Sequence, residues 1–274
     1  MPGAPDPEYV NARRVLLDAL EALGPQRDAV VLVGAHAIYL HTGEADLAVA
    51  PFTTDGDIAI DPEALAADPK LEEAMTRAGF VRDLTQPGVW IGDQSVKIDL
   101  LVPEALGGAG RRGARLGVHG NRAARKARGL EAALVDKAPM RIDAFEETDA
   151  RSFEIAVGAP AALLVAKLHK IGERGERADR LEDKDALDVL RLLRAIAVAE
   201  LAAGLQRLAG ADLSAEVTQE AISYLAELFS TPDAPGSRMA ARAATPLEDP
   251  DTVAASCAAL AGDLLSATEV LRSS

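Results

Sequence analysis

The chain has 274 residues, of which 49% are hydrophobic and only 3% aromatic, and its formal net charge is −14. This composition is typical of a soluble globular chain with an Ala, Leu and Val core, and the negative charge argues against a protein that coats nucleic acid non-specifically, while a local basic patch stays compatible with binding. The single cysteine, Cys257, excludes internal disulfides and thiolate metal clusters.

The first helix is predicted over residues 7–23, where apolar residues recur at helical spacing and Gly24-Pro25 ends the pattern. The preceding residues do not form a signal peptide, and no apolar stretch approaches transmembrane length. We therefore expect a cytoplasmic protein that makes no contact with a membrane.

Residues 28–43 combine a strand, a tight turn and a helix. The apolar run of residues 29–33 is typical of a buried strand, and it stops at Gly34, after which residues 35–43 are predicted to form a helix. A turn of this kind presents free backbone N–H groups at the start of the helix. The segment therefore predicts an anion site at Gly34.

Two carboxylates follow at the start of the next strand. Asp55 and Asp57 lead into residues 58–60, and residues two apart on a strand project to the same face. A third acid, Asp99, lies in the otherwise apolar strand predicted over residues 95–102. Mg²⁺ prefers such hard oxygen ligands together with substrate phosphates, so these acids favour a two-metal site for phosphoryl or nucleotidyl transfer.

This order of motifs resembles the DNA polymerase β-like nucleotidyltransferase superfamily. The matching residues are Gly34-Ala35 for the phosphate-binding turn, Asp55-Gly56-Asp57 for the paired acids and Asp99 for the third acid. Ala35 departs from the usual Gly or Ser, so it offers a backbone N–H but no hydroxyl. The alternative interpretation of an isolated Asp-Gly-Asp is a turn or a calcium-like surface loop, because Asp and Gly both favour turns.

Between and after these acids the elements are predicted from local patterns. We expect a helix over residues 62–78, with a break before Pro69 as an alternative, short strands at 80–82 and 89–91, and further strands at 140–143 and 153–157. The segment Arg111–Arg128 is the most basic of the chain. It is interpreted either as a solvated loop or as a contact for substrate phosphates or an RNA backbone.

The C-terminal half is predicted to be helical. A helix over residues 160–171 carries a basic row of Lys167, Lys170 and, just beyond it, Arg174, beside an apolar stripe, and Asp185 and Asp188 lie one turn apart on the next helix. An ordinary amphipathic helix with lysines along its edge is the alternative interpretation. Further helices are expected over residues 198–208, 215–229 and 253–271.

This second set of residues resembles the AbiEii-type nucleotidyltransferases, which include toxins of toxin–antitoxin and phage-defence systems. The resemblance covers roughly residues 28–194 and implies an α/β (α+β) fold, with a small mixed sheet flanked by helices in a nucleotidyltransferase domain (1–158) and an α-helical domain (159–274). It places the nucleotide in the cleft between the two domains.

The resemblance also implies the site and its chemistry. The enzyme would move a nucleoside monophosphate from a nucleoside triphosphate to an acceptor hydroxyl, with Mg²⁺ or Mn²⁺ held by Asp55, Asp57 and Asp99. Gly34, Ala35, Lys167 and Arg174 would bind the triphosphate, and Asp185 and Asp188 would orient the cations.

RNA or tRNA is the expected acceptor, through the Arg111–Arg128 segment, and a cognate antitoxin is an expected partner. Two other functions stay open: a small-molecule adenylyltransferase of the antibiotic-modifying type, and a catalytically decayed nucleotide-binding protein.

Overall fold

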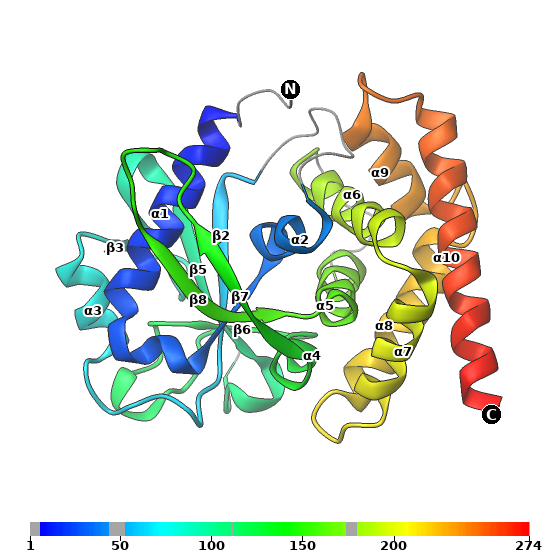
Figure 1. Cartoon of the computed structure of the whole chain (residues 1–274). Helices are drawn as coiled ribbons and strands as arrows, with labels where there is room; N and C mark the ends of the chain where they lie inside the picture. The colour runs from blue at the N-terminus through cyan, green and yellow to red at the C-terminus, as the bar shows by residue number, and fades with distance from the viewer. Residues whose placement is uncertain (1–5, 44–52, 111, 174–179, 274) are drawn as a thin grey trace. The chain divides into compact units, whose positions relative to one another are not determined.

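The computed structural model describes residues 6–43, 53–110, 112–173 and 180–273 (Figure 1). The chain divides into two compact units. Unit 1 comprises Met1–Ala37, Phe52–Leu130 and Lys137–Gly158, and unit 2 comprises Ile38–Pro51, Glu131–Asp136 and Ala159–Ser274. The predicted division at residue 158 stays a prediction.

Unit 1 is built on a mixed eight-stranded sheet. Its order is β3-β4-β5-β2-β1-β8-β7, and β6 pairs with β5 outside this path. The pairs β1–β8, β2–β5 and β5–β6 are parallel, and the pairs β1–β2, β3–β4, β4–β5 and β7–β8 are antiparallel. The strands are β1 (Val30–Val33), β2 (Asp55–Ile60), β3 (Val81–Arg82), β4 (Val89–Ile91), β5 (Lys97–Pro103), β6 (Arg125–Ala127), β7 (Lys137–Asp143) and β8 (Ser152–Gly158).

Helix α1 (Pro7–Leu23) packs on one face of this sheet, against β2 and β5 (Figure 1). The helix begins after Asp6, whose side chain accepts a hydrogen bond from the Glu8 N–H at 2.8 Å, and it ends at Gly24. Its leucine stripe is fully buried, so the bounds predicted from apolar spacing are confirmed. The short 3₁₀ helices are η1 (Gly24–Ala29), η2 (Asp93–Ser95), η3 (Glu104–Leu106) and η4 (Gly117–His119).

The prediction of a continuous helix over residues 62–78 is wrong for residues 62–70. Only α3 (Leu71–Arg77) is helical, and the preceding residues form turns and bends. The Gln26 side chain donates to the carbonyls of Ala66 and Pro69, at 2.9 and 2.8 Å, and accepts from the Ala66 N–H at 3.0 Å. These bonds satisfy backbone groups that a helix would have paired internally, and proline at 62 and 69 disfavours a continuous helix.

Unit 2 is helical. It contains α4 (Glu131–Val135), α5 (Pro160–Gly172), α6 (Arg180–Ala195), α7 (Val198–Ala209), α8 (Ala215–Phe229), α9 (Pro235–Ala244) and α10 (Pro250–Ser273), and α2 (Gly34–Thr42) begins in unit 1 and continues in unit 2. Helix α9 has no counterpart in the prediction. It carries small residues for close contact, since a Cβ on Gly236 would lie 2.6 Å from Phe229 Cζ.

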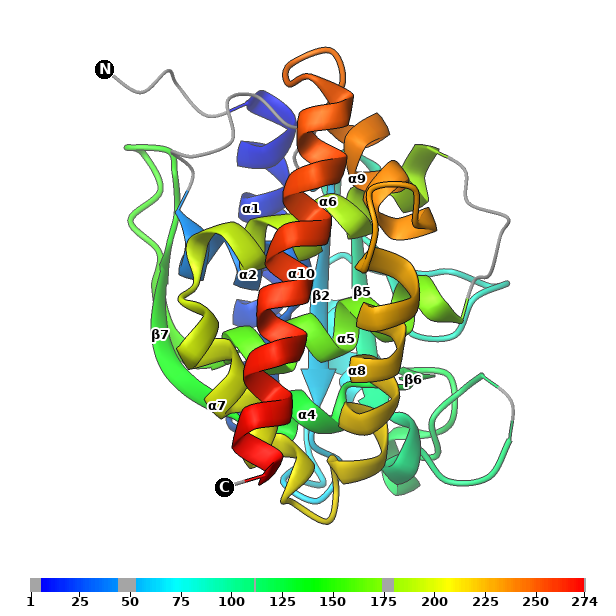
Figure 2. The same ribbon diagram turned by 90° about the vertical axis from the view of Figure 1, so that its right-hand side faces the viewer.

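Helix α10 lies alongside α7 and α8 and also packs against α9 (Figure 2). By length and composition alone its segment Pro250–Leu271 is apolar enough to cross a membrane, so the expectation that no stretch approaches that length is wrong for this segment. Val253, Cys257, Ala261 and Leu264 form a fully buried stripe. Such a stripe is the buried face of a helix that packs against its neighbours on one side.

The mixed sheet flanked by helices and the helical C-terminal part confirm the predicted fold class.

Candidate active site

The three predicted metal-binding acids lie on two neighbouring strands of unit 1. In the parallel pairing of β2 with β5, Asp57 lies directly opposite Asp99, and Asp55 lies opposite Lys97. Paired residues of neighbouring strands project to the same face, as do residues two apart along a strand. The structure therefore brings Asp55, Asp57 and Asp99 onto one face, which we call the acid face.

The acid face lies on the side of the sheet away from α1. A Cβ on Gly56 would lie 2.8 Å from Ile98 Cδ1 and 3.2 Å from Leu16 Cδ1, so glycine allows α1 to approach between the two aspartates. Ile58 and Ile98 are fully buried on the opposite face, which packs against α1. The three aspartates of the acid face are partly exposed. The local alternation thus separates a packed face from a face that solvent and ligands can reach.

Gly34 places the start of α2 against Asp57. Its φ is +69°, and a Cβ at this position would lie 2.8 Å from Asp57 Cβ and would overlap the carboxylate oxygen Oδ2. Glycine is therefore required both for the backbone conformation and for the space. The backbone N–H groups of the first turn of α2, including that of Ala35, begin beside the acid face, where the positive end of the helix favours negative charge.

Two of the acids have neighbours that the sequence did not reveal. The Thr53 hydroxyl donates to Asp55 Oδ1 at 2.5 Å. Arg125 Nη2 of β6 donates to Asp99 Oδ2, and the Asp99 side chain is 16% exposed. Both contacts depend on strand pairing and loop course, and the only signal in the sequence was that Arg125 belongs to the basic segment.

Among the residues that the structure describes, no group of three or more His, Cys, Asp or Glu side chains is arranged to hold a metal ion. The carboxylates that the register brings closest are those of Asp57 and Asp99.

In unit 2, Lys167 lies in a buried cluster of charges. Its Nζ is 2.7 Å from Asp185 Oδ1 and 2.8 Å from Asp188 Oδ2, and Lys170 Nζ is 3.2 Å from Asp185 Oδ1. Burial acts to lower the pKa of Lys167, but the charges of Asp185 and Asp188 outweigh it and raise this pKa well above its usual value. Lys167 is therefore charged, and it joins α5 to α6.

Arg191 and Tyr39 extend this cluster. Arg191 Nη1 lies 2.8 Å from Asp188 Oδ1 and donates to the Tyr39 hydroxyl at 2.6 Å, with the guanidinium carbon 4.6 Å from the centre of the Tyr39 ring. Burial raises the pKa of Tyr39 above its usual value, so the hydroxyl stays protonated. The prediction missed both residues; the i, i+3 spacing of Asp188 and Arg191 was the one local signal.

The basic segment is not one open loop. Arg122 Nη2 donates to the Leu84 carbonyl at 2.5 Å, Lys126 Nζ donates to the Gly108 carbonyl at 3.1 Å, and β6 lies within the segment. Arg112 and Arg115 are exposed, and their guanidinium groups make no hydrogen bond or ion pair with another residue of the described ranges. Arg111 and Arg174, both named as candidates above, lie outside the described residues.

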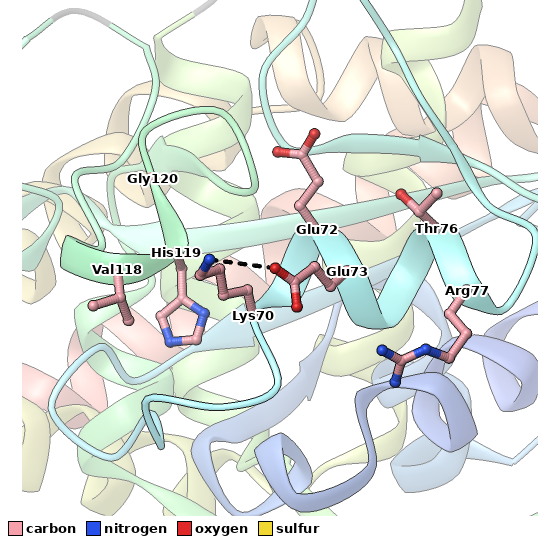
Figure 3. A pocket seen from close by; sticks show the side chains of 8 residues that line it. All are labelled: Lys70, Glu72, Glu73, Thr76, Arg77, Val118, His119 and Gly120. Atoms are coloured by element: carbon pink, nitrogen blue, oxygen red, sulfur yellow. Dashed lines mark ion pairs between the residues drawn. The ribbon is translucent and has the colours of Figure 1, made fainter.

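Unit 1 also has a hollow of about 720 Å³ beside α3 (Figure 3). Its lining mixes opposite charges, with Lys70 Nζ 3.3 Å from Glu73 Oε1. His119 accepts from the Leu71 N–H at 3.1 Å through Nδ1 and lies 3.0 Å from the Ala66 carbonyl through Nε2, so both ring nitrogens serve the fold. None of the predicted site residues lines this hollow.

One of the three comparisons with known proteins gave a match. A family model described as nucleotidyltransferase matches residues 12–207, a range that contains every predicted site residue. Neither the curated proteins nor the solved structures gave a match. Because the family model covers most of the chain and the acid face lies within it, the chain belongs to this nucleotidyltransferase family, whose members are transferases that move nucleoside monophosphate groups.

Proposed function

We propose that the chain transfers a nucleoside monophosphate from a nucleoside triphosphate to an acceptor hydroxyl in a reaction that requires Mg²⁺ or Mn²⁺. The observation that carries the proposal is the alignment of Asp57 with Asp99 on adjacent parallel strands, beside the glycine turn that starts α2. Carboxylates and helix-start N–H groups side by side suit a substrate that carries phosphates and a divalent cation.

The residues of the acid face fit such a cation. Mg²⁺ is commonly held by one or two protein carboxylates together with substrate phosphates, and Asp57 and Asp99 supply two hard oxygen donors from one face. Asp55, two residues from Asp57, adds a third carboxylate whose Oδ1 is also bound by Thr53. When bound, the cation would neutralise the triphosphate and promote attack by the acceptor hydroxyl.

The glycine turn and the three aspartates of the acid face have separate proposed roles. Gly34 and Ala35 would donate backbone N–H groups to the β- and γ-phosphates. Asp55 and Asp57 would hold the metal-bound triphosphate, and Asp99 would lie at the acceptor hydroxyl.

Lys167 has two separable roles in this proposal. Its two ion pairs give it a structural role in unit 2, and the family resemblance adds a role in neutralising the triphosphate, with Arg174 as a second cation. Asp185 and Asp188 would orient Lys167 in either role.

The experiment that tests metal-dependent binding is calorimetry of each nucleoside triphosphate with wild type, in Mg²⁺ and in excess chelator. We expect tight binding only with Mg²⁺ or Mn²⁺, because clustered carboxylates repel a triphosphate unless cations intervene. Asp57→Asn should lose this binding and keep the melting temperature. Asp61→Asn is the matched control, since Asp61 comes after the last residue of β2 and its carboxylate accepts from the Glu63 N–H at 3.0 Å. Equal affinity in chelator would contradict the proposal.

For the acceptor we propose RNA, with tRNA as the first candidate. We further propose that the protein acts in the cytoplasm as the toxin-like member of a toxin–antitoxin or phage-defence pair. Arg112 and Arg115 are exposed and make no ion pair within the described part of the chain, which supports an RNA acceptor, because binding to RNA phosphates requires available cations. The net charge of −14 supports the second candidate, a small cationic acceptor such as a hydroxylated amine. Labelling of RNA and of such amines with radioactive nucleotide distinguishes the two.

A further inference from the structure

Arg125 pairs directly with Asp99 on the acid face. It lies on β6 opposite Leu101 of β5, which is two residues beyond Asp99 on the same strand. By the alternation of strand side chains, Arg125, Leu101 and Asp99 project to one face. The guanidinium group reaches diagonally across the two strands, and its Nη2 donates to Asp99 Oδ2.

The backbone fixes Arg125 in this position. A Cβ on Gly88 would lie 2.5 Å from the Arg125 nitrogen and 2.6 Å from the Leu100 carbonyl oxygen, so β6 fits closely against its neighbours. On the other side of Arg125, the Ala114 N–H donates to the Ala124 carbonyl at 3.0 Å and the Lys126 N–H to the Arg112 carbonyl at 2.8 Å. The ion pair is therefore built by paired strands rather than by a chance encounter of two surface side chains.

The pair is also partly shielded from water. The Arg125 and Asp99 side chains are 33% and 16% exposed. Partial burial strengthens a charge-assisted hydrogen bond relative to an exposed pair. A divalent cation that uses Asp99 has to share or displace this guanidinium, and the two positive charges repel each other at short range.

We propose that Arg125 is a positioning residue that competes with the divalent cation for the Asp99 carboxylate, and that it thereby sets the metal concentration at which the site fills. This inference rests on the proposed function, because it takes Asp99 as a metal ligand. It removes Arg125 from the set of arginines assigned to RNA and gives it a role at the acid face.

The test measures Mn²⁺ binding by electron paramagnetic resonance, in the absence of nucleotide, for wild type, Arg125→Gln and Arg125→Lys. We expect Arg125→Gln to bind Mn²⁺ about tenfold more tightly, because the charge-assisted bond that occupies the ligand is removed. Arg125→Lys should lie between the two, since an ammonium group keeps the charge but not the forked geometry. Thermal unfolding checks that each variant is folded.

Arg82→Gln is the matched control. Arg82 lies on β3 of the same sheet, and its Nη1 is 2.7 Å from Glu72 Oε2, so the variant removes an arginine–carboxylate pair away from the acid face. Its Mn²⁺ affinity should stay within about twofold of wild type, because the interaction between distant charges is screened by salt.

Asp99→Asn and the double variant Asp99→Asn/Arg125→Gln separate this inference from the proposed function. If Asp99→Asn weakens Mn²⁺ binding and Arg125→Gln strengthens it only when Asp99 is present, both stand. If Asp99→Asn weakens binding but Arg125→Gln is unchanged or weaker, the competition is refuted and the metal site stands. If Asp99→Asn binds Mn²⁺ as wild type does, or if neither wild type nor Arg125→Gln binds it, the metal role of Asp99 fails and the competition fails with it.

Discussion

Gly34 and Asp57 show how single residues decide the geometry of the acid face. The glycine adopts φ +69° and leaves room only for a hydrogen beside the Asp57 carboxylate. A helix start and a carboxylate can approach this closely because no side chain stands between them.

We predict that Gly34→Ala lowers both triphosphate affinity and stability, because the methyl group strains the backbone and displaces Asp57 or the first turn of α2. Gly43→Ala is the control, since Gly43 has φ +70° but no atom of the described residues lies within 4 Å of its Cβ position. The backbone strain, of roughly 1–2 kcal/mol, is common to both variants, so urea unfolding and calorimetry isolate the effect of the overlap. Equal losses in the two variants would show that the contact with Asp57 is unimportant.

At this scale the sequence predicted which acids the sheet brings onto one face but not the residues that contact them. Asp55, Asp57 and Asp99 were predictable because strand alternation and the spacing of acids are local patterns. Arg125 and Tyr39 were not, because their partners are fixed by strand register in one case and by helix packing in the other.

Among the elements, α5 and α6 are joined by the buried charges of Lys167, Asp185 and Asp188. The i, i+3 spacing of the aspartates was visible in the sequence, whereas the burial of Lys167, which is 6% exposed, was not. Because Lys167 pairs with two buried carboxylates, its charge is part of the packed core between α5 and α6.

Lys167→Ala should therefore destabilise unit 2 by up to ~3–5 kcal/mol, because it removes the buried cation that Asp185 and Asp188 share and leaves them only Lys170 and Arg191. Lys170→Ala is the control: its side chain is 37% exposed, and a surface pair is worth roughly 0–1 kcal/mol. Urea unfolding measures both, and triphosphate affinity under folding conditions then reports any direct role of Lys167. A stability of Lys167→Ala close to wild type would contradict the buried cluster.

Helices α1 and α2 meet at His36, which is stacked on Tyr9 with ring centres 5.2 Å apart. Its Nδ1 accepts from Arg13 Nε at 3.4 Å, and its Nε2 has no hydrogen-bond partner in the part of the chain that is described. Burial, with the Arg13 charge second, lowers the pKa of His36 well below 6.5.

From the lowered pKa of His36 we predict that the protein loses stability in mild acid. Below pH 6.5 the unfolded chain takes up a proton on His36 and the folded chain does not, so the free energy of unfolding falls as pH decreases. The loss should reach about 1 kcal/mol at a pH one unit below 6.5. Urea unfolding of wild type and His36→Gln at neutral and mildly acid pH checks this, and an equal pH dependence in the two proteins would refute it.

Elements were predictable where apolar periodicity was strong, as in α1, β1 and α5. The helix predicted over residues 62–78 failed because Gln26, distant in sequence, bonds the backbone that a helix would have paired. Strand β6 was not predicted, because its three residues lie in a glycine- and arginine-rich segment and are too few to show an alternation of apolar and polar residues.

Because the whole molecule has a net charge of −14, the exposed Arg112 and Arg115 are the main test of an RNA acceptor. Replacing both Arg112 and Arg115 by Gln should weaken RNA binding and flatten its salt dependence, by a log–log slope of about 0.7–0.9 for each RNA phosphate that is no longer neutralised. Triphosphate binding should not change, because the acid face uses other residues. An unchanged salt slope would leave the segment without a role in RNA binding.

The most direct test of the acid face as an active site is a transfer assay on the full chain. Wild type, Asp57→Asn, Asp99→Asn and the control Asp61→Asn are incubated with each α-labelled nucleoside triphosphate, Mg²⁺, and either RNA or hydroxylated amines. We predict that wild type and Asp61→Asn label one acceptor class, and that Asp57→Asn, Asp99→Asn and wild type in chelator label none. Transfer by Asp57→Asn and Asp99→Asn at the wild-type rate would contradict the assignment of the acid face as the active site.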